Sequence, residues 1–502
     1  MRSPVRFPNR RTRILLCLPL SAALILLASA CYNVGRENSW IRVQNMGGSP
    51  ANIEIKYMAG DGSLISAGGC PQAGVCDAIP AGGGWTFVES QNGGLPAGYL
   101  GSAVIVSDQP IAVLFGKDSD RGGGYFQTAG DTVALSAGSG KLFLPIVIDR
   151  DGPAQNWDAR FAIQNMGDST ACATLVYLSN YTDSEVRTDP AAGAAPLAGC
   201  PNGGIPIPAN GTLFRSFATM GVGPSFTGSV RVDLQKNGQG VQPAQQSVVA
   251  SAEVYSTTSR HFASYSGLTT NEMGTSLLLP LVERTASGRW STDFEIMNSD
   301  PSQPANVTLR IEGWDGNNQY VVKESSFTVN ASRICFQDSD WANCLSPGDT
   351  LPQNFHDGVA RITSTKPVGV IVSRSTNADE TYTSYRAITV DSASQKVFLP
   401  LVNKNSPTGA SRTGWNSWVR VMVADGGWAN VTVRYIGTGG EFSYTTPLYR
   451  AATFIQPWES VLPDGFVGSA IIESDRPIVA LGNVTAGAYA GDTELIYNGV
   501  PQ

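Results

Sequence analysis

The sequence predicts an all-β protein built from four tandem antiparallel β-sandwich modules after an N-terminal signal segment. Three observations predict it. Charged residues make up only 15% of the 502 residues and hydrophobic residues 42%, which is typical of a folded chain. Glycine (55 residues) and proline (30 residues) are abundant, as expected where many turns join short strands. Blocks of sequence recur along the chain, and inside each block apolar and polar residues alternate with the period of a β-strand.

The first element is an export signal over residues 1–30. Residues 1–13 carry five arginines and no acidic residue, and residues 14–30 are almost wholly apolar. A basic segment followed by a short apolar run is the pattern of a secretory signal peptide. Arg10-Arg11 fits a twin-arginine signal only in part, because Arg13 stands where that pattern has an apolar residue.

The end of the apolar run, Leu27-Ala28-Ser29-Ala30-Cys31, resembles a bacterial lipobox. This resemblance implies that Cys31 is lipidated and that the protein is anchored on the exported side of the bacterial cell envelope. The alternative is an ordinary cleavage after Ala30, which would leave Cys31 unmodified and release a secreted protein.

The remaining cysteines predict disulfides. The mature chain contains seven cysteines, and six remain if Cys31 carries lipid. They fall as local pairs within successive blocks, and export places them where disulfides persist. We therefore expect three bonds: Cys70–Cys76, Cys172–Cys200 and Cys335–Cys344. The chain has no Cys-x-x-Cys pair with a nearby histidine, so neither a metal site nor a cofactor is expected.

Internal repeats define the modules. Ser39–Val43 (SWIRV) matches Ser417–Val421 (SWVRV), and residues 51–57 match residues 429–435 at the same offset. A second anchor pairs residues 95–105 with residues 462–472, and a Leu-Pro anchor recurs at residues 144, 279 and 399. Four modules are predicted from these anchors, over residues 31–138, 139–273, 274–394 and 395–502.

Each module reads as a set of strands. In the first, Ile41 and Val43 alternate with Arg42 and Gln44, which predicts a strand buried on one face only. Residues 53–57 alternate in the same way, and the Gly-, Ser- and Pro-containing segment 46–50 suggests that the two strands form a hairpin. The set resembles immunoglobulin-like or fibronectin-III-like modules and repeats of uncharacterised bacterial surface proteins.

Residues for chemistry are scarce. The net charge of −7 argues against nucleic acid as a partner, since nucleic-acid binding needs a basic surface. The only histidines, His261 and His356, are expected on a strand and in a surface loop. Three acidic pairs have too few oxygens for a calcium site and read as solvated turns: Asp118/Asp120, Asp149/Asp151 and Asp338/Asp340. No catalytic motif is present, so the protein is not expected to be an enzyme.

Tryptophans are the last candidates. Trp40 and Trp418 occupy equivalent strand starts, which favours packing in the core or between modules. Trp415 precedes a strand and Trp428 is expected in a loop, where an exposed aromatic ring could stack on sugar rings. These observations predict a non-catalytic cell-envelope lipoprotein that acts as a structural, spacer or adhesion array. Its expected partners are the membrane, through the lipid, and cell-wall or extracellular glycans or surface proteins. The alternatives are a glycan-binding surface protein, or an extracellular enzyme with an unfamiliar site in the second module, whose insertion near 235–246 is the clearest departure from the repeat.

Overall fold

A computed structural model describes most of the chain after residue 36. The described residues are 37–92, 94–120, 126–133, 141–149, 157–179, 184–191, 193–200, 203–223, 225–235, 248–285, 290–300, 302–330, 334–338, 351–352, 354–376, 381–405, 414–486 and 492–502. Within these ranges no helix has the length and apolar character needed to cross a membrane.

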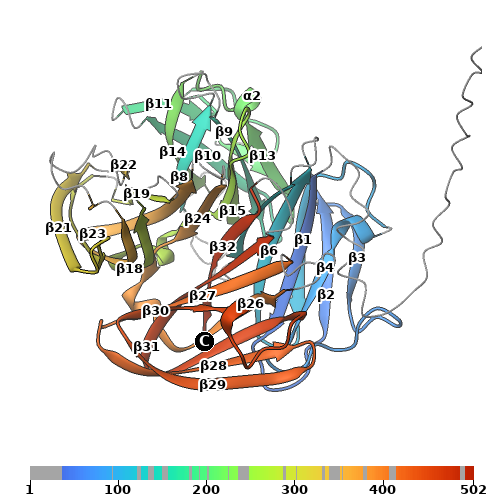
Figure 1. Cartoon of the computed structure of the whole chain (residues 1–502). Coiled ribbons are helices and arrows are strands. Elements are labelled where there is room, and N and C mark those ends of the chain that lie inside the picture. Colours follow the sequence, from blue (N-terminus) through green and yellow to red (C-terminus); the bar gives the residue numbers. More distant parts are fainter. Residues whose placement is uncertain are drawn as a thin grey trace, which may run out of the picture.

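The fold is all-β, as predicted, and its strands pair antiparallel throughout the described ladders. We name the four strand groups sandwich 1 (β1–β7), sandwich 2 (β8–β17), sandwich 3 (β18–β25) and sandwich 4 (β26–β33). Sandwiches 1 and 2 each contain two separate sheets, whereas sandwiches 3 and 4 each contain one eight-stranded sheet that forms both layers, and an apolar core lies between the layers. Figure 1 shows the groups arranged around β32 rather than in a row.

Sandwich 1 has one sheet of order β4-β1-β6-β7 and a second of order β3-β2-β5. Its elements are β1 (Glu37–Asn45), β2 (Ile53–Ala59), β3 (Leu64–Cys70), β4 (Gly84–Val88), the 3-10 helix η1 (Glu89–Gln91), β5 (Gly101–Ser107), β6 (Ile111–Asp120) and β7 (Phe126–Val133).

Sandwich 2 has sheets of order β11-β10-β14-β8-β17, with β12 beside β10, and β13-β9-β15-β16. Its elements are β8 (Lys141–Asp149), β9 (Trp157–Asn165), β10 (Ala171–Ser179), β11 (Ser184–Asp189), β12 (Ile205–Ile207), β13 (Thr212–Ser216), the helix α2 (Phe217–Met220), β14 (Phe226–Gln235), β15 (Val248–Ser256), β16 (Phe262–Ser266), β17 (Leu268–Thr269) and η2 (Thr270–Glu272).

In sandwiches 3 and 4 one long strand, β23 or β31, pairs with strands of both layers and so joins them into a single sheet. Sandwich 3 contains β18 (Gly274–Arg284), β19 (Ser291–Asn298), β20 (Ala305–Trp314), β21 (Tyr320–Val329), β22 (Ile334–Asp338), β23 (Phe355–Thr376), β24 (Thr381–Arg386), β25 (Ile388–Thr389) and η3 (Val390–Ser392). Sandwich 4 contains β26 (Ser394–Lys404), β27 (Trp415–Val423), β28 (Trp428–Gly437), β29 (Gly440–Tyr449), β30 (Ala451–Ile455), η4 (Gln456–Trp458), β31 (Phe466–Ala486), β32 (Glu494–Asn498) and β33 (Val500–Pro501).

Two expectations about the first strands are wrong. β1 and β2 do not form a hairpin, because β1 pairs with β4 and β6 in one sheet while β2 pairs with β3 and β5 in the other. Nor is β1 buried on one face only, since Arg42 and Gln44 are as buried as Ile41 and Val43. The cause is tertiary: sandwich 4 covers the face that the alternation assigns to solvent, and Gln44 Nε2 donates to the carbonyl oxygen of Ala470.

The Leu-Pro anchors form the first strand of sandwiches 2, 3 and 4. The ladder register shifts at each of these anchors, which marks a bulge. A tyrosine from the last long strand of the same sandwich secures each bulge by donating its hydroxyl proton to the carbonyl of the residue after proline. The three pairs are Tyr265 with Ile146, Tyr385 with Leu281 and Tyr497 with Leu401.

The four sandwiches close into a ring. Strands β7, β16, β24 and β32, one from each sandwich, contact one another in cyclic order, so that β32 of the last sandwich meets β7 of the first. Asp492 shows the closure at one residue. Its Oδ2 accepts hydrogen bonds from the amides of Phe262 and Tyr382, both at 2.8 Å, and its carbonyl oxygen accepts from the Thr128 amide at 2.9 Å. One residue of sandwich 4 thus binds the other three sandwiches.

Two predicted disulfide pairs lie within the described residues. Cys70 is bonded to Cys76, and Cys172 is bonded to Cys200. Each bond ties the end of an edge region back to its own sandwich. Cys31 and Cys344 lie outside the described residues, as does the side chain of Cys335. Lipidation of Cys31 and the Cys335–Cys344 bond therefore stay predictions.

Candidate functional site between sandwiches 3 and 4

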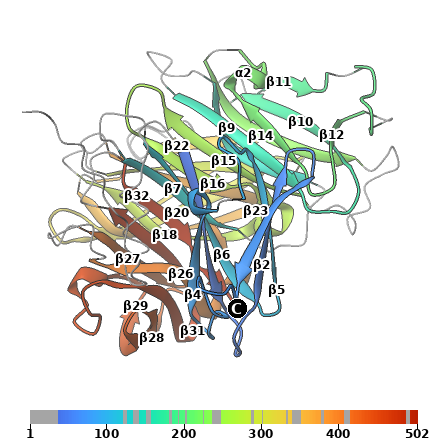
Figure 2. The ribbon, with the colours of Figure 1, turned by 90° about the vertical axis from the view of Figure 1, so that its right-hand side faces the viewer.

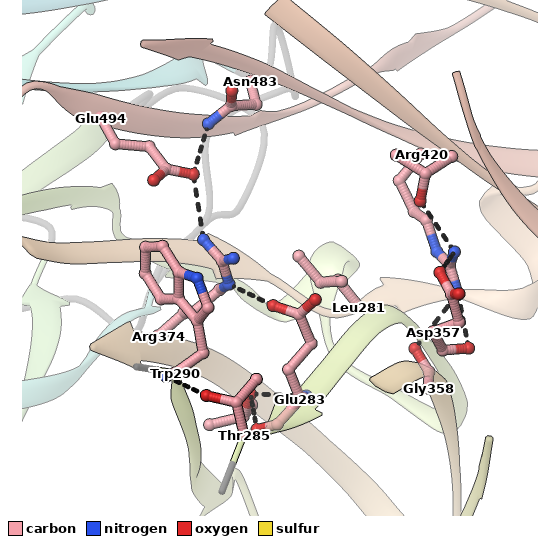
Figure 3. A network of polar contacts seen from close by, with 12 residues as sticks. Leu281, Glu283, Thr285, Trp290, Asp357, Gly358, Arg374, Arg420, Asn483 and Glu494 are labelled. Atoms are coloured by element: carbon pink, nitrogen blue, oxygen red, sulfur yellow. Dashed lines mark hydrogen bonds and ion pairs between the residues drawn. The ribbon is translucent and has the colours of Figure 1, made fainter. Parts of the chain in front are cut away.

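A buried arginine fastens sandwich 4 to sandwich 3. Arg420 on β27 is fully buried, and its Nε donates to the carbonyl oxygen of Pro280 in the Leu-Pro strand β18, at 3.0 Å. Its two terminal nitrogens reach the Asp357 carboxylate at 3.0 Å and the backbone carbonyls of Asp357 and Gly358. Figure 3 shows this cluster beside a second one centred on Arg374.

The second cluster lies in the same junction. Arg374 lies over the ring of Trp290, with the guanidinium carbon 3.2 Å from the ring centroid, and it pairs with Glu283 at 2.7 Å and Glu494 at 2.9 Å. Asn483 also donates to Glu494, at 2.7 Å. Burial raises the pKa of Glu494, and the charge of Arg374 opposes this effect. Because their polar groups are tied together, these two clusters make the junction a fixed support.

A cleft opens over this support. It has a volume of about 600 Å³ and is lined by residues from both sandwiches. Sandwich 3 contributes β20, the start of β21 and the start of β23, and sandwich 4 contributes the β29–β30 corner and Arg420. The lining residues are Glu312, Trp314, Tyr320, Asp357, Val359, Arg420, Tyr449, Arg450, Ala451, Ala452, Thr453 and Ile455.

Aromatic side chains form two cross-strand pairs here: both members of the first line the cleft, and the second joins Tyr449 of the lining to Trp428 beside it. Trp314 and Tyr320 are directly opposite in the β20–β21 ladder, with ring centroids 5.3 Å apart. Trp428 and Tyr449 are directly opposite in the β28–β29 ladder, with centroids 5.1 Å apart. Cross-strand pairing of this kind orders aromatic rings on the surface of a sheet. Trp314 keeps 43% of its surface exposed and Trp428 keeps 65%, so both pairs present rings to solvent.

Arg450 joins the two aromatic pairs. It has a φ of 62°, in the left-handed region that a non-glycine residue adopts at a cost. Its guanidinium carbon lies 4.8 Å from the Tyr320 ring centroid and 5.1 Å from that of Tyr449. One terminal nitrogen donates to the buried carboxylate of Glu312 at 2.9 Å and also to the Tyr320 hydroxyl. The strained backbone therefore holds a cation between rings of two different sandwiches.

The charges in the cleft are matched. Burial raises the pKa of Tyr320, and the neighbouring Glu312 carboxylate adds to this rise, so the phenol stays protonated. Asp357 has a φ of 50°, and it holds its exposed carboxylate beside Arg420 at the cleft wall. The site thus combines aromatic faces with a guanidinium, a phenol and carboxylates, and neutral polar ligands can donate to or accept from these groups.

The structure places the predicted tryptophans as follows. Trp40 is buried in the core of sandwich 4, and Trp418 packs against the core of sandwich 3, so both pack between modules as one reading proposed. Trp415 packs on the core of sandwich 4. Trp428, expected in a loop, begins β28 and stacks beside Tyr449 at the cleft.

The histidines and the acidic pairs do not converge. His261 is buried and stacked on Trp157 at 5.2 Å, while half-buried His356 binds the carbonyl oxygen of Asn354. Asp118 accepts from Trp40 and from Thr128. Each acidic pair has one carboxylate or more outside the described residues: Asp120, Asp151, Asp338 and Asp340. Across the described ranges, no three His, Cys, Asp or Glu side chains gather into a metal-binding group.

Sequence reasoning missed Trp314, Tyr320, Tyr449 and Arg450. A weak signal was available for the aromatics, because a Trp and a Tyr flank the turn of one hairpin, at 314/320, and another Trp and Tyr stand at the open end of the equivalent hairpin, at 428/449. Nothing in the sequence indicated that these hairpins belong to neighbouring sandwiches that face a shared cleft. The insertion near 235–246, which marks the second module as the alternative place for an enzyme site, lies outside the described residues except for Gln235.

Comparisons with known proteins give no family. No protein-family model and no curated protein matches the chain. Among solved structures, the infectious bursal disease virus Gt strain is 9% identical over 89% of this chain and 78% of that chain, with a TM-score of 0.13. The T13 viral particle of the same virus is 8% identical over 92% of this chain and 81% of that chain, also with a TM-score of 0.13. Scores this low carry no argument about fold or function.

Proposed function

We propose that the protein is a non-catalytic, carbohydrate-binding lipoprotein of the bacterial cell envelope, and that the cleft between sandwiches 3 and 4 is its binding site. The observation that carries this proposal is the pair of exposed aromatic ladders, Trp314/Tyr320 and Trp428/Tyr449, on either side of Arg450. Exposed apolar groups gathered at one cleft, rather than scattered singly, mark a binding surface.

The chemistry of the cleft favours a sugar over a purely apolar ligand. A pyranose ring presents C–H groups on its faces and hydroxyls around its edge. The indole rings of Trp314 and Trp428 offer apolar faces, while Arg450 and Asp357 offer a donor and an acceptor next to them. Covering about 80 Å² of indole at ~25 cal/mol per Å² contributes about 2 kcal/mol per ring. Two such rings suit weak, repeated contacts along a polysaccharide.

The ring arrangement supports a binding role over a spacer role. A spacer gains length when its modules follow one another in a line. Here sandwich 1 packs against sandwich 4, and Arg42 of β1 donates to the carbonyl oxygen of Pro400 at 2.9 Å. A closed ring is shorter than a linear array of the same four sandwiches, and it holds the cleft on a rigid body. This arrangement suits adhesion to a surface glycan.

Titration of soluble polysaccharides into the mature protein tests this proposal. Cell-wall glycans, bacterial exopolysaccharides and host-type glycans are screened by affinity electrophoresis and then by calorimetry. Replacing Trp428 or Trp314 with alanine should weaken binding at least tenfold, because each ring contributes about 2 kcal/mol. Trp458→Ala is the matched control, since Trp458 is 80% exposed and belongs to neither of the two aromatic pairs. Equal losses in all three variants, or binding unchanged by Trp428→Ala, would contradict the assignment of the site.

The lipid anchor is tested separately. Cys31→Ser should move the protein from the membrane fraction to the soluble fraction, because two or more acyl chains give stable anchoring. Mass spectrometry of the wild-type N-terminus measures the modification directly. An unmodified Cys31 on a protein free in the medium would show that the cleavage after Ala30 is ordinary.

A further inference from the structure

Within the described residues, sandwich 1 lacks one strand that its three relatives have. In sandwiches 2, 3 and 4 the Leu-Pro strand is the first strand, and it pairs with one later strand of the same sandwich. The pairs are β8 with β14, β18 with β23 and β26 with β31. The corresponding strand of sandwich 1 is β5, and in the described residues it pairs only with β2. β5 is therefore an edge strand at the place where each relative has a neighbour (Figure 2).

Register establishes which residues correspond. Tyr57 on β2 is opposite Ala103 on β5, and Tyr435 on β28 is opposite Ala470 on β31. Residues 101–107 (GSAVIVS) then align with residues 468–474 (GSAIIES) without a gap. In sandwich 4 this segment faces β26, with Val397 opposite Ile472 and Leu399 opposite Ala470.

Apolar side chains on and beside β5 are less covered than their equivalents in sandwich 4. Ala470 and Ile472 are fully buried in sandwich 4, whereas the equivalent Ala103 and Ile105 are only partly buried. Val106, at the end of β5, keeps 47% of its surface exposed, and Leu100, just before β5, keeps 65%. An open edge with apolar residues is a template for another strand, and natural proteins protect such edges unless they use them.

We propose that β5 is a strand-addition site, at which an extended apolar segment of a partner protein pairs antiparallel with Gly101–Ser107 and completes sandwich 1. The three relatives define the chemistry of that segment. It carries aliphatic residues opposite Ala103 and Ile105, as Leu399 and Val397 lie opposite Ala470 and Ile472. Backbone hydrogen bonds give such additions their affinity, and side-chain pockets give them selectivity.

The residue of the added segment that lies opposite Val106 should differ from its counterpart in sandwich 4. There, Lys396 is opposite Glu473 and pairs with it at 3.6 Å. Sandwich 1 has Val106 in place of Glu473. A segment with an aliphatic residue at this place therefore fits β5 better than one with lysine, since directly opposite side chains of matched character stabilise a strand pair.

The partner is a different protein rather than a second copy. Each Leu-Pro strand of this chain is already paired inside its own sandwich, so a second copy would have to open a folded sandwich to donate one. The added segment also needs no proline carbonyl for sandwich 2 to contact. Sandwich 2 has Ala162 at the position of Arg42 and Arg420, so no buried arginine there requires a carbonyl from the added strand.

Two peptides copied from this chain serve as probes. The first has the sequence of residues 396–404, KVFLPLVNK, and the second replaces its first lysine with valine. Binding to the mature chain carrying Cys31→Ser is followed by fluorescence anisotropy, and hydrogen exchange with mass spectrometry locates it. The valine peptide should protect the β5 amides and bind roughly twofold to fivefold more tightly than the lysine peptide.

Val106→Glu sharpens the test, because it copies sandwich 4 at an exposed position and leaves the core intact. It should reverse the preference, so that the lysine peptide binds more tightly. No protection of β5 by either peptide, or protection that Val106→Glu leaves unchanged, would overturn the proposal. A concentration-dependent dimer that buries β5 in the free protein would overturn it as well, by assigning the edge to a second copy.

Discussion

Sandwiches 1 and 4 carry the best-matched sequences in the chain, and they differ in what surrounds them. Both place an arginine at the same point of their β1-type strand, and both arginines donate to a proline carbonyl of the neighbouring sandwich, Arg42 to Pro400 and Arg420 to Pro280. Sandwich 4 also has its own Leu-Pro strand, β26, paired with β31. Sandwich 1 shows no such partner for β5 in the described residues.

The same difference is visible at a single pair of equivalent residues. Tyr497 secures the β26 bulge, whereas the same register position in sandwich 1 is Asp131, which pairs with Arg386 of sandwich 3 and accepts from the Ser266 amide of sandwich 2. The comparison teaches that a repeat can keep its fold while one strand position is reassigned. The position that contacts the Leu-Pro strand in sandwich 4 contacts the neighbouring sandwiches of the ring in sandwich 1.

Truncating the junction arginines should give the largest effect. Arg420→Ala leaves the buried carbonyls of Pro280 and Gly358 without their donor, and we expect a loss of about 3–5 kcal/mol of unfolding free energy. Arg42→Ala should cost less, about 2 kcal/mol, because the Ser469 hydroxyl also donates to Pro400, at 2.9 Å. Chemical denaturation measures both. Equal losses of unfolding free energy in the two variants would show that the Ser469 hydroxyl does not compensate for the loss of Arg42.

Truncating two equivalent isoleucines, one in each sandwich, should give the next largest difference in unfolding free energy. Ile472→Ala removes a fully buried side chain and should destabilise by about 3 kcal/mol. Ile105→Ala removes a partly exposed one and should cost about 1 kcal/mol. Thermal unfolding of the two variants beside the wild type measures the difference. A larger loss for Ile105→Ala would mean that β5 is covered in solution.

Tyr497→Phe should have a smaller effect. The substitution keeps the ring and removes the hydroxyl that donates to the Leu401 carbonyl. We expect a loss of about 1 kcal/mol, the usual contribution of one hydrogen bond. Hydrogen exchange should show faster exchange of the amides around Leu401 in the variant. Unchanged exchange there would indicate that the bulge does not depend on the tyrosine.

The last comparison between the two sandwiches concerns pH. Glu89 and Gln456 occupy the same position, next to Tyr57 and Tyr435 respectively. Burial raises the pKa of Glu89 to about 8. The folded chain therefore holds a proton that the unfolded chain releases, and stability falls as pH rises from about 4.5 towards 8.

Glu89→Gln copies sandwich 4 and should remove this dependence. The variant and the wild type should unfold alike at pH 4, whereas the variant should be the more stable at pH 8. Melting temperatures across this range test it. Parallel curves for the two proteins would assign Glu89 an ordinary pKa.

The local structure was largely predictable from the repeats. The shared spacing from Trp40 to Tyr57 and from Trp418 to Tyr435 places both tyrosines on corresponding strands, opposite Ala103 and Ala470. Two local cysteine pairs are bonded as spacing and export predicted. These features depend on residues that lie close together in the sequence, and repetition makes their pattern visible.

The ring and the cleft were not predictable in this way. Arg42 and Pro400 are 358 residues apart, and the alternation in β1 assigns Arg42 to solvent because it carries no record of a second sandwich on that face. The cleft needs two hairpins from different sandwiches to face each other. One signal was available for the open edge: the Leu-Pro anchor occurs three times among four modules.

Closure of the four sandwiches into a ring is the central claim, and small-angle X-ray scattering of the mature chain carrying Cys31→Ser tests it most directly. A compact body of this length should have a radius of gyration of about 23 Å. Four sandwiches in a line, spaced by about 35 Å, would give roughly 40 Å. A monomer near the smaller value, with a single-peaked distance distribution, is the result we predict. A value near 40 Å would contradict the contact between sandwiches 1 and 4.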